Sequence, residues 1–392
     1  MRFGSGISVE TDTGAALRAA LGRATAHLND RPDLVFVFAS PHHRAGLTAI
    51  AAAAADAGRV SLGCLAEAVI AGRREVEDGP AVVAWAGCLP EVLVAALRLG
   101  IARAPEGLAV TGWELPEDPA GVVLVVDPTS FPIVPFVDRL ATQHPGLPVS
   151  GGMASGGLFV NGEVLSGGAV GIALAGPVRF RTLVSQGCRP VGRPFVVTAA
   201  DGHTVRELGG RPALAALNQM LELLSPDDRQ LAQRGLLLGV VVDEYRTEFR
   251  PADFLVRNLI GADPQSGALE VGERVAVGRT IQFQVRDPET AAQELETLLG
   301  ELAGAVGRRQ ESLEQAGGRR QEPHGENGVL LFTCNGRGRR FFGVPDHDAG
   351  LVSERLRPEA LAGFFAAGEI GPVAGVPFLH GYTASLVELD LP

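Results

Sequence analysis

The sequence predicts a fold of mixed α/β (α+β) class, built from two related halves with mixed, largely antiparallel β-sheets covered by outer helices. Each half contains one continuous apolar run with the length of a fully buried strand, at residues 121–127 and 236–243. Each half also places an Asn-Gly or Asp-Gly pair, at 161–162 and 201–202, between two short β-rich runs, which indicates a hairpin. A helical pattern at 131–143 follows the first buried run, so we expect a helix that covers the sheet.

In the first half, apolar residues spaced three or four apart after a capping residue indicate helices, and short apolar or alternating runs indicate strands. We expect, in chain order, a strand at 7–10, a helix from 11 to about 28, a strand at 34–39, a helix at 45–57, and strands at 60–64 and 81–86. The run 92–99 fits a strand or a short helix, because periodicity does not separate the two. After residue 143 we expect a hairpin at 158–165 and strands at 168–175 and 178–184.

The second half continues with a hairpin at 195–208, a helix from Pro212 to about residue 224, and strands at 236–243, 254–261, 267–271 and 280–285. Pro288 opens a further helix, whose apolar stripe through Leu302 is typical of core packing. Residues 304–328 are polar and contain few apolar side chains, so we expect a mobile loop there, either a lid or a disordered segment. Strands at 329–332 and 384–389 complete the chain.

The bulk composition limits the function classes. A chain of 392 residues favours two domains over one, and we place them at 1–187 and 188–392. The net charge of −11 argues against binding to nucleic acid, because phosphate binding needs a basic surface. The most apolar long stretch, residues 81–102, is interrupted by Pro90, Glu91 and Arg98, so we expect no membrane span.

The amino terminus lacks the continuous apolar core of a signal peptide, so we place the protein in the cytoplasm. Its four cysteines lie far apart and show no Cys-x-x-Cys spacing. We therefore expect free thiols, no metal site and no cofactor.

The stretch after the apolar run 329–332 is the strongest candidate for a binding site. The strand ends in Cys334, Asn335, Gly336, Arg337 and Gly338. Small residues in such a loop allow backbone amides to face outward, so a carboxylate or a phosphate could bind there beside the Arg337 guanidinium. We therefore expect the carboxylate of a small ligand at this loop.

Three segments in this order resemble the FIST family (F-box and intracellular signal transduction). They are Phe-Thr-Cys-Asn-Gly-Arg-Gly at 332–338, Gly-Phe-Phe-Ala-Ala-Gly-Glu-Ile-Gly-Pro at 363–372 and Leu-His-Gly-Tyr-Thr at 379–383. The stretch 60–70, followed by Glu75 and Pro80, is similar to the amino-terminal FIST half. The resemblance implies a prokaryotic sensory module that binds a small ligand, with relatives among eukaryotic F-box proteins of ubiquitin signalling and no established catalytic residues.

The remaining candidate ligand residues lie at other predicted strand ends and turns. Gly368 and Gly371 flank Glu369 and indicate a turn that presents this carboxylate to a ligand ammonium. The further candidates are Gly63, Cys64, Glu67, Gly151, Gly152 and His380. Each has a structural alternative: glycine permits close packing, cysteine is a small and often buried residue, Glu67 could be a solvated cap, and His380 could bind a backbone carbonyl.

We therefore interpret the sequence as that of a sensory protein for an amino acid or a related metabolite, with a possible signalling protein as partner. Two other functions remain open. If Cys334 is a nucleophile, His380 could be its base and Glu369 the group that orients the histidine, giving a hydrolase or transferase. Alternatively, the chain is a scaffold that offers a surface to another protein.

Overall fold

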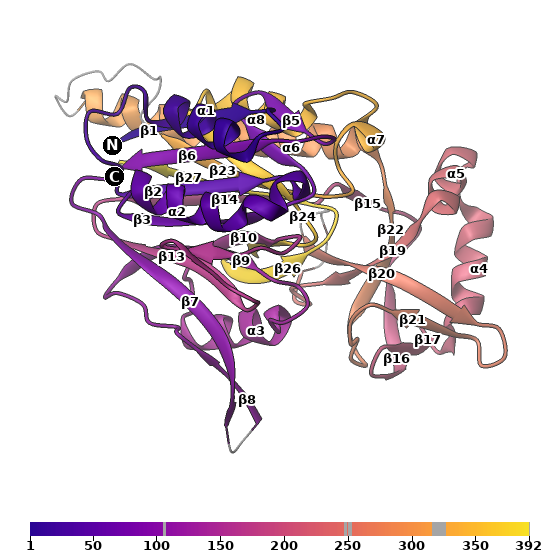
Figure 1. Cartoon of the computed structure of the whole chain (residues 1–392). Helices are drawn as coiled ribbons and strands as arrows, with labels where there is room; N and C mark the ends of the chain where they lie inside the picture. Colours follow the sequence, from indigo (N-terminus) through magenta and orange to yellow (C-terminus); the bar gives the residue numbers. More distant parts are fainter. Residues whose placement is uncertain (105–106, 247–248, 250–252, 316–326, 392) are drawn as a thin grey trace. The chain divides into compact units, whose positions relative to one another are not determined.

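The computed structural model describes residues 1–104, 107–246, 249, 253–315 and 327–391, which form two compact units (Figure 1). The first unit comprises Met1–Val184, Leu295–Leu379 and Thr383–Pro392, and the second comprises Ser185–Glu294 and His380–Tyr382. The mixed and antiparallel sheets with their helices confirm the predicted α+β class. Among the described helices, none is long and apolar enough to cross a membrane.

Three sheets make up the first unit in the described part of the chain. The first sheet contains, in order, β1 (Arg2–Ser8), β6 (Val82–Cys88), β2 (Leu34–Ala39), β3 (Val60–Leu65), β11 (Phe159–Val160) and β12 (Glu163–Val164). The second contains β26 (Val376–His380), β25 (Glu369–Val373), β10 (Val149–Met153), β9 (Pro119–Val126), β13 (Ala169–Ala175), β7 (Leu93–Ala104) and β8 (Gly107–Thr111). The third contains β14 (Arg179–Ser185), β27 (Ala384–Asp390), β23 (Gly328–Cys334), β24 (Ala360–Ala366), β4 (Val69–Ala71) and β5 (Arg74–Val76).

The same module recurs once in each sheet. It consists of two parallel strands joined through helix, then a hairpin, then a strand that returns antiparallel to the first. The parallel pairs are β2 and β3, β9 and β10, and β23 and β24. The returning strands are β6, β13 and β27. The expected relation between two sequence halves remains a prediction; within the described residues of the first unit, the topology relates three modules.

Each module gives its hairpin to another module's sheet. The hairpin of the first module pairs through β4 with β24, that of the second through β11 with β3, and that of the third through β25 with β10. The exchange starts at the carboxyl ends of the parallel strands, where backbone hydrogen bonds cross between modules. They join Leu65 N to Gly156 O (3.0 Å), Phe365 N to Ala68 O (2.9 Å) and Met153 N to Gly368 O (2.8 Å). The three modules therefore form a closed cycle.

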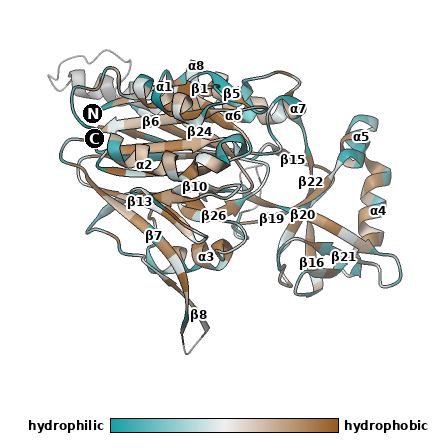
Figure 2. Cartoon of the chain, in the orientation of Figure 1, coloured by the Kyte–Doolittle hydropathy of each residue, from teal (hydrophilic) through white to brown (hydrophobic). Residues whose placement is uncertain are grey.

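The inner faces of the three sheets share one apolar core, to which Phe38, Val125 and Phe364 each contribute from a different sheet. The ring centroids of Phe38 and Phe364 lie 5.1 Å apart, a separation typical of packed aromatic pairs. Figure 2 shows the strands of this unit as largely hydrophobic, for example β24.

Helices cover the outer faces of the sheets. Those of the first unit are α1 (Thr13–Thr25), η1 (Pro41–Gly46), α2 (Leu47–Ala57), α3 (Ile133–Gln143), α7 (Arg339–Phe342) and α8 (His347–Leu356), together with α6 (Pro288–Gln315) from Leu295 onward. The helices α1 and α2 pack on the first sheet, α3 on the second, and α6 and α8 on the third. Leu295 and Leu299 of α6 are fully buried, as the predicted apolar stripe requires.

The second unit is an insertion in the third module. In the first module the chain passes from the outer strand β1 through α1 to β2, whereas in the third it leaves β14, forms the second unit and returns through α6 to β23. The predicted sequence domains at 1–187 and 188–392 remain a prediction, since these compact units are divided differently along the chain.

The second unit, in its described residues, forms one sheet, two helices and the start of α6 at residues 288–294. The strands are β15 (Cys188–Pro190), β22 (Thr280–Arg286), β16 (Phe195–Asp201), β17 (Thr204–Leu208), β21 (Ala268–Val271), β20 (Phe254–Asp263) and β19 (Leu236–Val241), with β18 (Arg211–Pro212) paired to β17. The helices are α4 (Ala213–Leu223) and α5 (Pro226–Arg234). Figure 2 shows α4 as hydrophobic and α5 as mostly hydrophilic, and only α4 has buried residues.

Two expectations about elements are resolved. The run 92–99, which fitted a strand or a helix, belongs to strand β7. Residues 304–315, expected in a mobile loop, are the carboxyl-terminal part of α6. The sequence there contains Glu, Gln, Arg and Leu, which favour helix even where few residues are apolar. The rest of the predicted loop, at 316–326, lies outside the described residues.

Replacing Gly363 by Ala tests the close pairing of the central parallel strands. A Cβ atom at Gly363 of β24 would lie 1.7 Å from the carbonyl oxygen of Leu331 in β23, so the two strands would have to separate. We expect a loss of about 1–3 kcal/mol in the free energy of unfolding, measured by urea denaturation. The control is Gly350→Ala in α8, where a Cβ meets nothing within 4 Å, and a gain of about 0.5–1 kcal/mol is expected. Equal stabilities of the two variants would contradict this packing.

Candidate functional site

The candidate site lies at the carboxyl ends of the parallel strands, where α/β sheets commonly bind ligands. In each of the three modules, one residue at the carboxyl end of the first parallel strand occupies an equivalent position. In each, its backbone N–H donates at 2.9 Å to the carbonyl oxygen of the residue before the returning strand. The pairs are Ser40 and Ala81, Asp127 and Gly168, and Cys334 and Thr383.

The first two modules use these side chains for local structure. The hydroxyl oxygen of Ser40 accepts the Ala81 N–H at 2.9 Å, and Asp127 Oδ1 accepts hydrogen bonds from the backbone and hydroxyl of Thr129 and Ser130. In the third module Glu369, not Cys334, accepts the corresponding Thr383 N–H. Cys334 is half-buried, and its thiol is not needed to cap the returning strand.

Arg337 forms a buried ion pair with Asp348 of α8. Its Nε lies 2.7 Å from Asp348 Oδ2, and its Nη2 lies 3.0 Å from Oδ1, with both side chains at most 2 % exposed. Thr333 donates to Oδ2 at 2.5 Å, and His347 Nδ1 lies 2.9 Å from Oδ1. Burial would raise the pKa of Asp348, but the Arg337 charge and these hydrogen bonds hold it well below its usual range.

The Arg337 guanidinium is thus engaged by the protein, and the expectation that it holds a ligand carboxylate remains a prediction. Two guanidinium nitrogens bind a carboxylate of the protein itself, in the bidentate geometry that arginine favours. The loop amides are also bound internally. Asn335 N donates to Ala366 O, Arg337 N donates to Cys334 O, and Arg339 N donates to Glu77 Oε1, each at 2.8 Å.

Aromatic rings cover the ion pair. The Arg337 Cζ atom lies 5.1 Å from the centroid of the Phe342 ring, which suits a cation–π contact. The Phe342 ring in turn stacks on His347, with centroids 3.4 Å apart and planes 8° from parallel. The short helix α7 and the start of α8 are thereby held over the strand ends.

Glu369, the first residue of β25, is a fully buried carboxyl beside this pair. Its Oε2 accepts hydrogen bonds from Thr383 N (3.1 Å) and Thr383 Oγ1 (2.8 Å). Burial raises its pKa to about 8, although Thr383, Arg337 and the Cys334 thiol each lower it. Among the described residues, no N–H or hydroxyl donates to Oε1, and the hydrogen bond from the Cys334 thiol is the contact that lowers the pKa on this side.

Glu75 of β5 is a second buried carboxyl near Asp348. Its Oε1 accepts the Ala349 N–H at 2.8 Å in the first turn of α8. Burial and the neighbouring Asp348 charge raise its pKa to about 8. The hairpin that carries Glu75 comes from the first module, so the hairpin exchange brings this carboxyl to the third module's site.

Several predicted site residues lie in the sheets instead. Gly63 and Gly151 permit close backbone approach, because a Cβ would lie 1.8 Å from Val37 O and 1.9 Å from Leu124 O respectively. Gly152 of β10 is likewise buried, and a Cβ there would meet Ala366 at 2.8 Å. Cys64 is buried among apolar side chains, and burial raises the pKa of its thiol.

The structure brings together Cys334, Arg337 and Glu369 of the predicted set, with Asn335 and Gly336 half-buried at the loop. Gly338 has a φ of +84°, and Gly368 is buried at the hairpin exchange. Glu67 is exposed. His380 is buried in the second unit, whereas Cys334 and Glu369 belong to the first, so the predicted Cys–His–Glu arrangement remains a prediction.

Sequence reasoning did not select Asp348, Thr383 or Thr333. Asp348 lies in an Asp-His-Asp sequence at the start of a helix, which by itself indicates only a helix start. The four cysteines are free thiols, as predicted. In the part of the chain that the structure describes, no group of three or more His, Cys, Asp or Glu side chains is placed to hold a metal ion.

Comparison with known proteins gives a consistent result over the whole chain. A FIST N domain profile matches residues 33–211, and a FIST C domain profile matches residues 213–372. The chain is 42 % identical over 399 residues to uncharacterized protein Mb0898c of Mycobacterium bovis, covering 98 % of each chain. It is 41 % identical over 401 residues to uncharacterized protein Rv0628c of Mycobacterium tuberculosis, covering 98 % of this chain and 99 % of the relative.

Replacing Asp348 by Asn tests the buried ion pair. The variant leaves the Arg337 guanidinium buried without its carboxylate, so we expect a loss of about 3–5 kcal/mol in the free energy of unfolding, measured by urea denaturation. The control is Glu163→Gln, which breaks the Arg98–Glu163 pair, whose side chains are both more than half exposed. That change should cost less than about 1 kcal/mol. A loss for Asp348→Asn as small as the control's would show that the pair does not hold the site together.

The raised pKa of Glu369 predicts a dependence of stability on pH. Between its usual pKa of 4.5 and its folded value of about 8, the folded state keeps the proton that the unfolded chain releases. The free energy of unfolding therefore falls as pH rises through this range. In Glu369→Gln the melting temperature should fall less between pH 5 and pH 8, with Glu75 supplying the slope that remains. The exposed Glu67→Gln serves as the control and should keep the full slope; the same slope in all three proteins would rule out the shifted carboxyl.

Proposed function

The chain belongs to the FIST family, whose domains are signal-transduction sensory domains, and from this premise we propose that it senses a small metabolite that carries a primary amine. The proposed site lies at the ends of β23 and β25, around Cys334 and Glu369. The observation that carries the proposal is the fully buried carboxyl of Glu369, which lies beside the half-buried Cys334 thiol and whose second oxygen, Oε1, accepts no N–H or hydroxyl of the described residues.

An ammonium group suits this oxygen for two reasons. A buried carboxylate oxygen that only a weak thiol donor reaches is poorly compensated for its burial, so a strong ligand donor gains more there than it would at the surface. A positive charge beside Glu369 also favours the ionised carboxylate, which burial alone disfavours. An amino acid or a related amine is therefore the ligand class that we propose.

The Arg337–Asp348 pair has a positioning role in this proposal. Arg337 is bound to Asp348, and its positive charge lowers the pKa of Glu369. Cys334, Asn335 and Gly336 are the half-buried residues of the loop, so they form the side from which a ligand would approach. A change in the α7 and α8 segment on ligand binding would then be the signal that a partner protein detects.

One observation favours a cysteine-dependent enzyme as a second candidate. The Cys334 thiol lies against a carboxyl whose pKa of about 8 is close to neutral pH, so the Glu369 carboxylate could accept the thiol proton and leave a thiolate nucleophile. Iodoacetamide forms a carbon–sulfur bond with a thiolate and releases iodide. Rapid labelling of Cys334 at neutral pH that slows in Glu369→Gln would favour the enzyme over the sensor.

The sensor is tested by thermal shift with three matched compounds: alanine, ethylamine, which lacks the carboxylate, and propionate, which lacks the amine. We expect alanine or ethylamine to raise the melting temperature and propionate to leave it unchanged. In Glu369→Gln the dissociation constant should rise at least about tenfold, because a hydrogen bond to a charged group is lost. Glu67→Gln changes an exposed carboxylate and should bind as the unaltered chain does.

A shift with propionate equal to that with alanine, or an unchanged affinity in Glu369→Gln, would refute the amine site. If a broad panel of amines produces no shift, while the chain retains a protein partner from lysate, the scaffold function replaces the sensor.

A further inference from the structure

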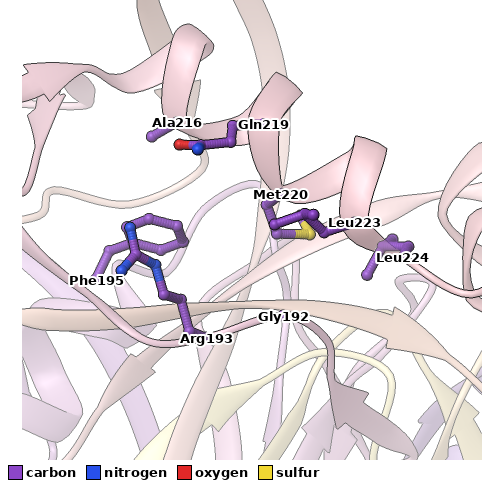
Figure 3. Close-up of a pocket in the computed structure, with 8 residues that line it drawn as sticks. All are labelled: Gly192, Arg193, Phe195, Ala216, Gln219, Met220, Leu223 and Leu224. Atoms are coloured by element: carbon purple, nitrogen blue, oxygen red, sulfur yellow. The ribbon is translucent and has the colours of Figure 1, made fainter.

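The second unit contains a cavity of about 380 Å³ that lies outside the proposed amine site. Figure 3 shows it between helix α4 and the segment that leads from Gly192 to Phe195 at the start of β16. Cavities that bind small molecules commonly measure about 300–1,000 Å³ and combine an apolar lining with a few polar groups. This cavity lies at the lower end of that range.

The floor of the cavity is apolar. Phe195 of β16 and Ala216, Met220 and Leu224 from α4 and its end line it, and each is buried. On the side opposite α4, the backbone at Gly192 approaches the helix closely, because a Cβ there would lie 2.5 Å from Met220 Cγ. The φ of +65° at this residue also favours glycine. The cavity thus follows from the small residues Gly192 and Ala216 on its two sides.

The rim is polar and positively charged. The guanidinium of Arg193 lies over the Phe195 ring, with its Cζ atom 5.1 Å from the ring centroid, and Figure 3 shows the two side chains together. Gln219 stands at the rim on α4, and its Oε1 accepts a hydrogen bond from Arg211 at 3.1 Å, which places a second guanidinium near the opening. None of the residues that line the cavity is acidic. Among the described residues, Arg193 has no carboxylate within ion-pair distance.

The charge at the rim and the apolar floor select one kind of occupant. An uncharged apolar molecule would make no use of the Arg193 charge, and a small anion without a tail would leave the floor exposed to water. Leu223 at the rim is 81 % exposed and could contact another protein. A flat protein surface, however, would not fill the cavity itself.

We propose that this cavity binds a small carboxylic acid with an apolar tail, whose carboxylate contacts Arg193 and whose tail lies on Phe195, Met220 and Leu224. The site is separate from Cys334 and Glu369 in residues and in ligand charge, so it stands independently of the amine proposal.

Isothermal titration of the full chain with octanoate tests the proposal, with octanol and acetate as comparison ligands. Octanol has the tail without the charge, and acetate has the charge without the tail. We expect saturable binding of one octanoate per chain, binding of octanol at least about tenfold weaker, and no measurable binding of acetate.

Two pairs of variants locate the binding. Arg193→Gln removes the rim charge at an exposed position and should weaken octanoate binding by about two- to fivefold, whereas Arg206→Gln, an exposed arginine on β17, should have no effect. Ala216→Phe fills the cavity and should abolish binding, whereas Ala215→Phe at the exposed neighbouring position should retain it. Glu369→Gln should bind octanoate normally, which separates this site from the amine site.

Octanol binding as tight as that of octanoate, or unchanged octanoate binding in Arg193→Gln, would overturn the proposal. Absence of octanoate binding would overturn it as well. If that absence accompanies self-association that Leu223→Ser abolishes, the apolar recess is an interface between two copies of the chain.

Discussion

The exchange of hairpins among three sheets is the constraint on which the first unit depends. Each parallel strand pair ends where another module's hairpin begins, and the backbone hydrogen bonds of Leu65, Met153 and Phe365 close the cycle there. Because the inner sheet faces share one core, no module can bury its apolar surface without the other two. The carboxyl ends of all three parallel pairs consequently carry elements from two modules each, which is where polar groups distant in sequence meet.

In the third module this position carries a cluster of buried charged side chains. In the other two modules the equivalent residues bind nearby groups: Ser40 accepts the Ala81 N–H, and Asp127 accepts the backbone and hydroxyls of Thr129 and Ser130. In the third module Glu369, not Cys334, caps the returning strand. A buried arginine supports the cluster by pairing with Asp348, which also fixes the start of α8. Buried ion pairs contribute little net stability compared with apolar packing, but removing one partner is costly, so such a pair is better suited to holding a defined arrangement.

Much of the fold was predictable because continuous apolar runs such as 121–127 have few alternative structures. The run 92–99 could not be assigned, since its length fits both a strand and a short helix. The helix at 304–315 was not predicted because its residues are mostly polar, and polar residues such as Glu, Gln and Arg also favour helix. In the site, the loop after the run 329–332 was found from its glycines and Arg337. The partner of Arg337 could not be found, because a carboxylate eleven residues further along has no local signature, and glycines that pack strands look the same in sequence as glycines that line a site.

The central claim is that Glu369 is a buried carboxyl with a shifted pKa that an amine ligand can reach. A titration of carbon-13-labelled glutamate carboxyls by NMR, with Glu369→Gln used to assign the signal, measures this directly. We expect a pKa of about 8 in the absence of ligand and a lower pKa when alanine or ethylamine is added. A pKa near the usual 4.5 that does not change with either compound would contradict it.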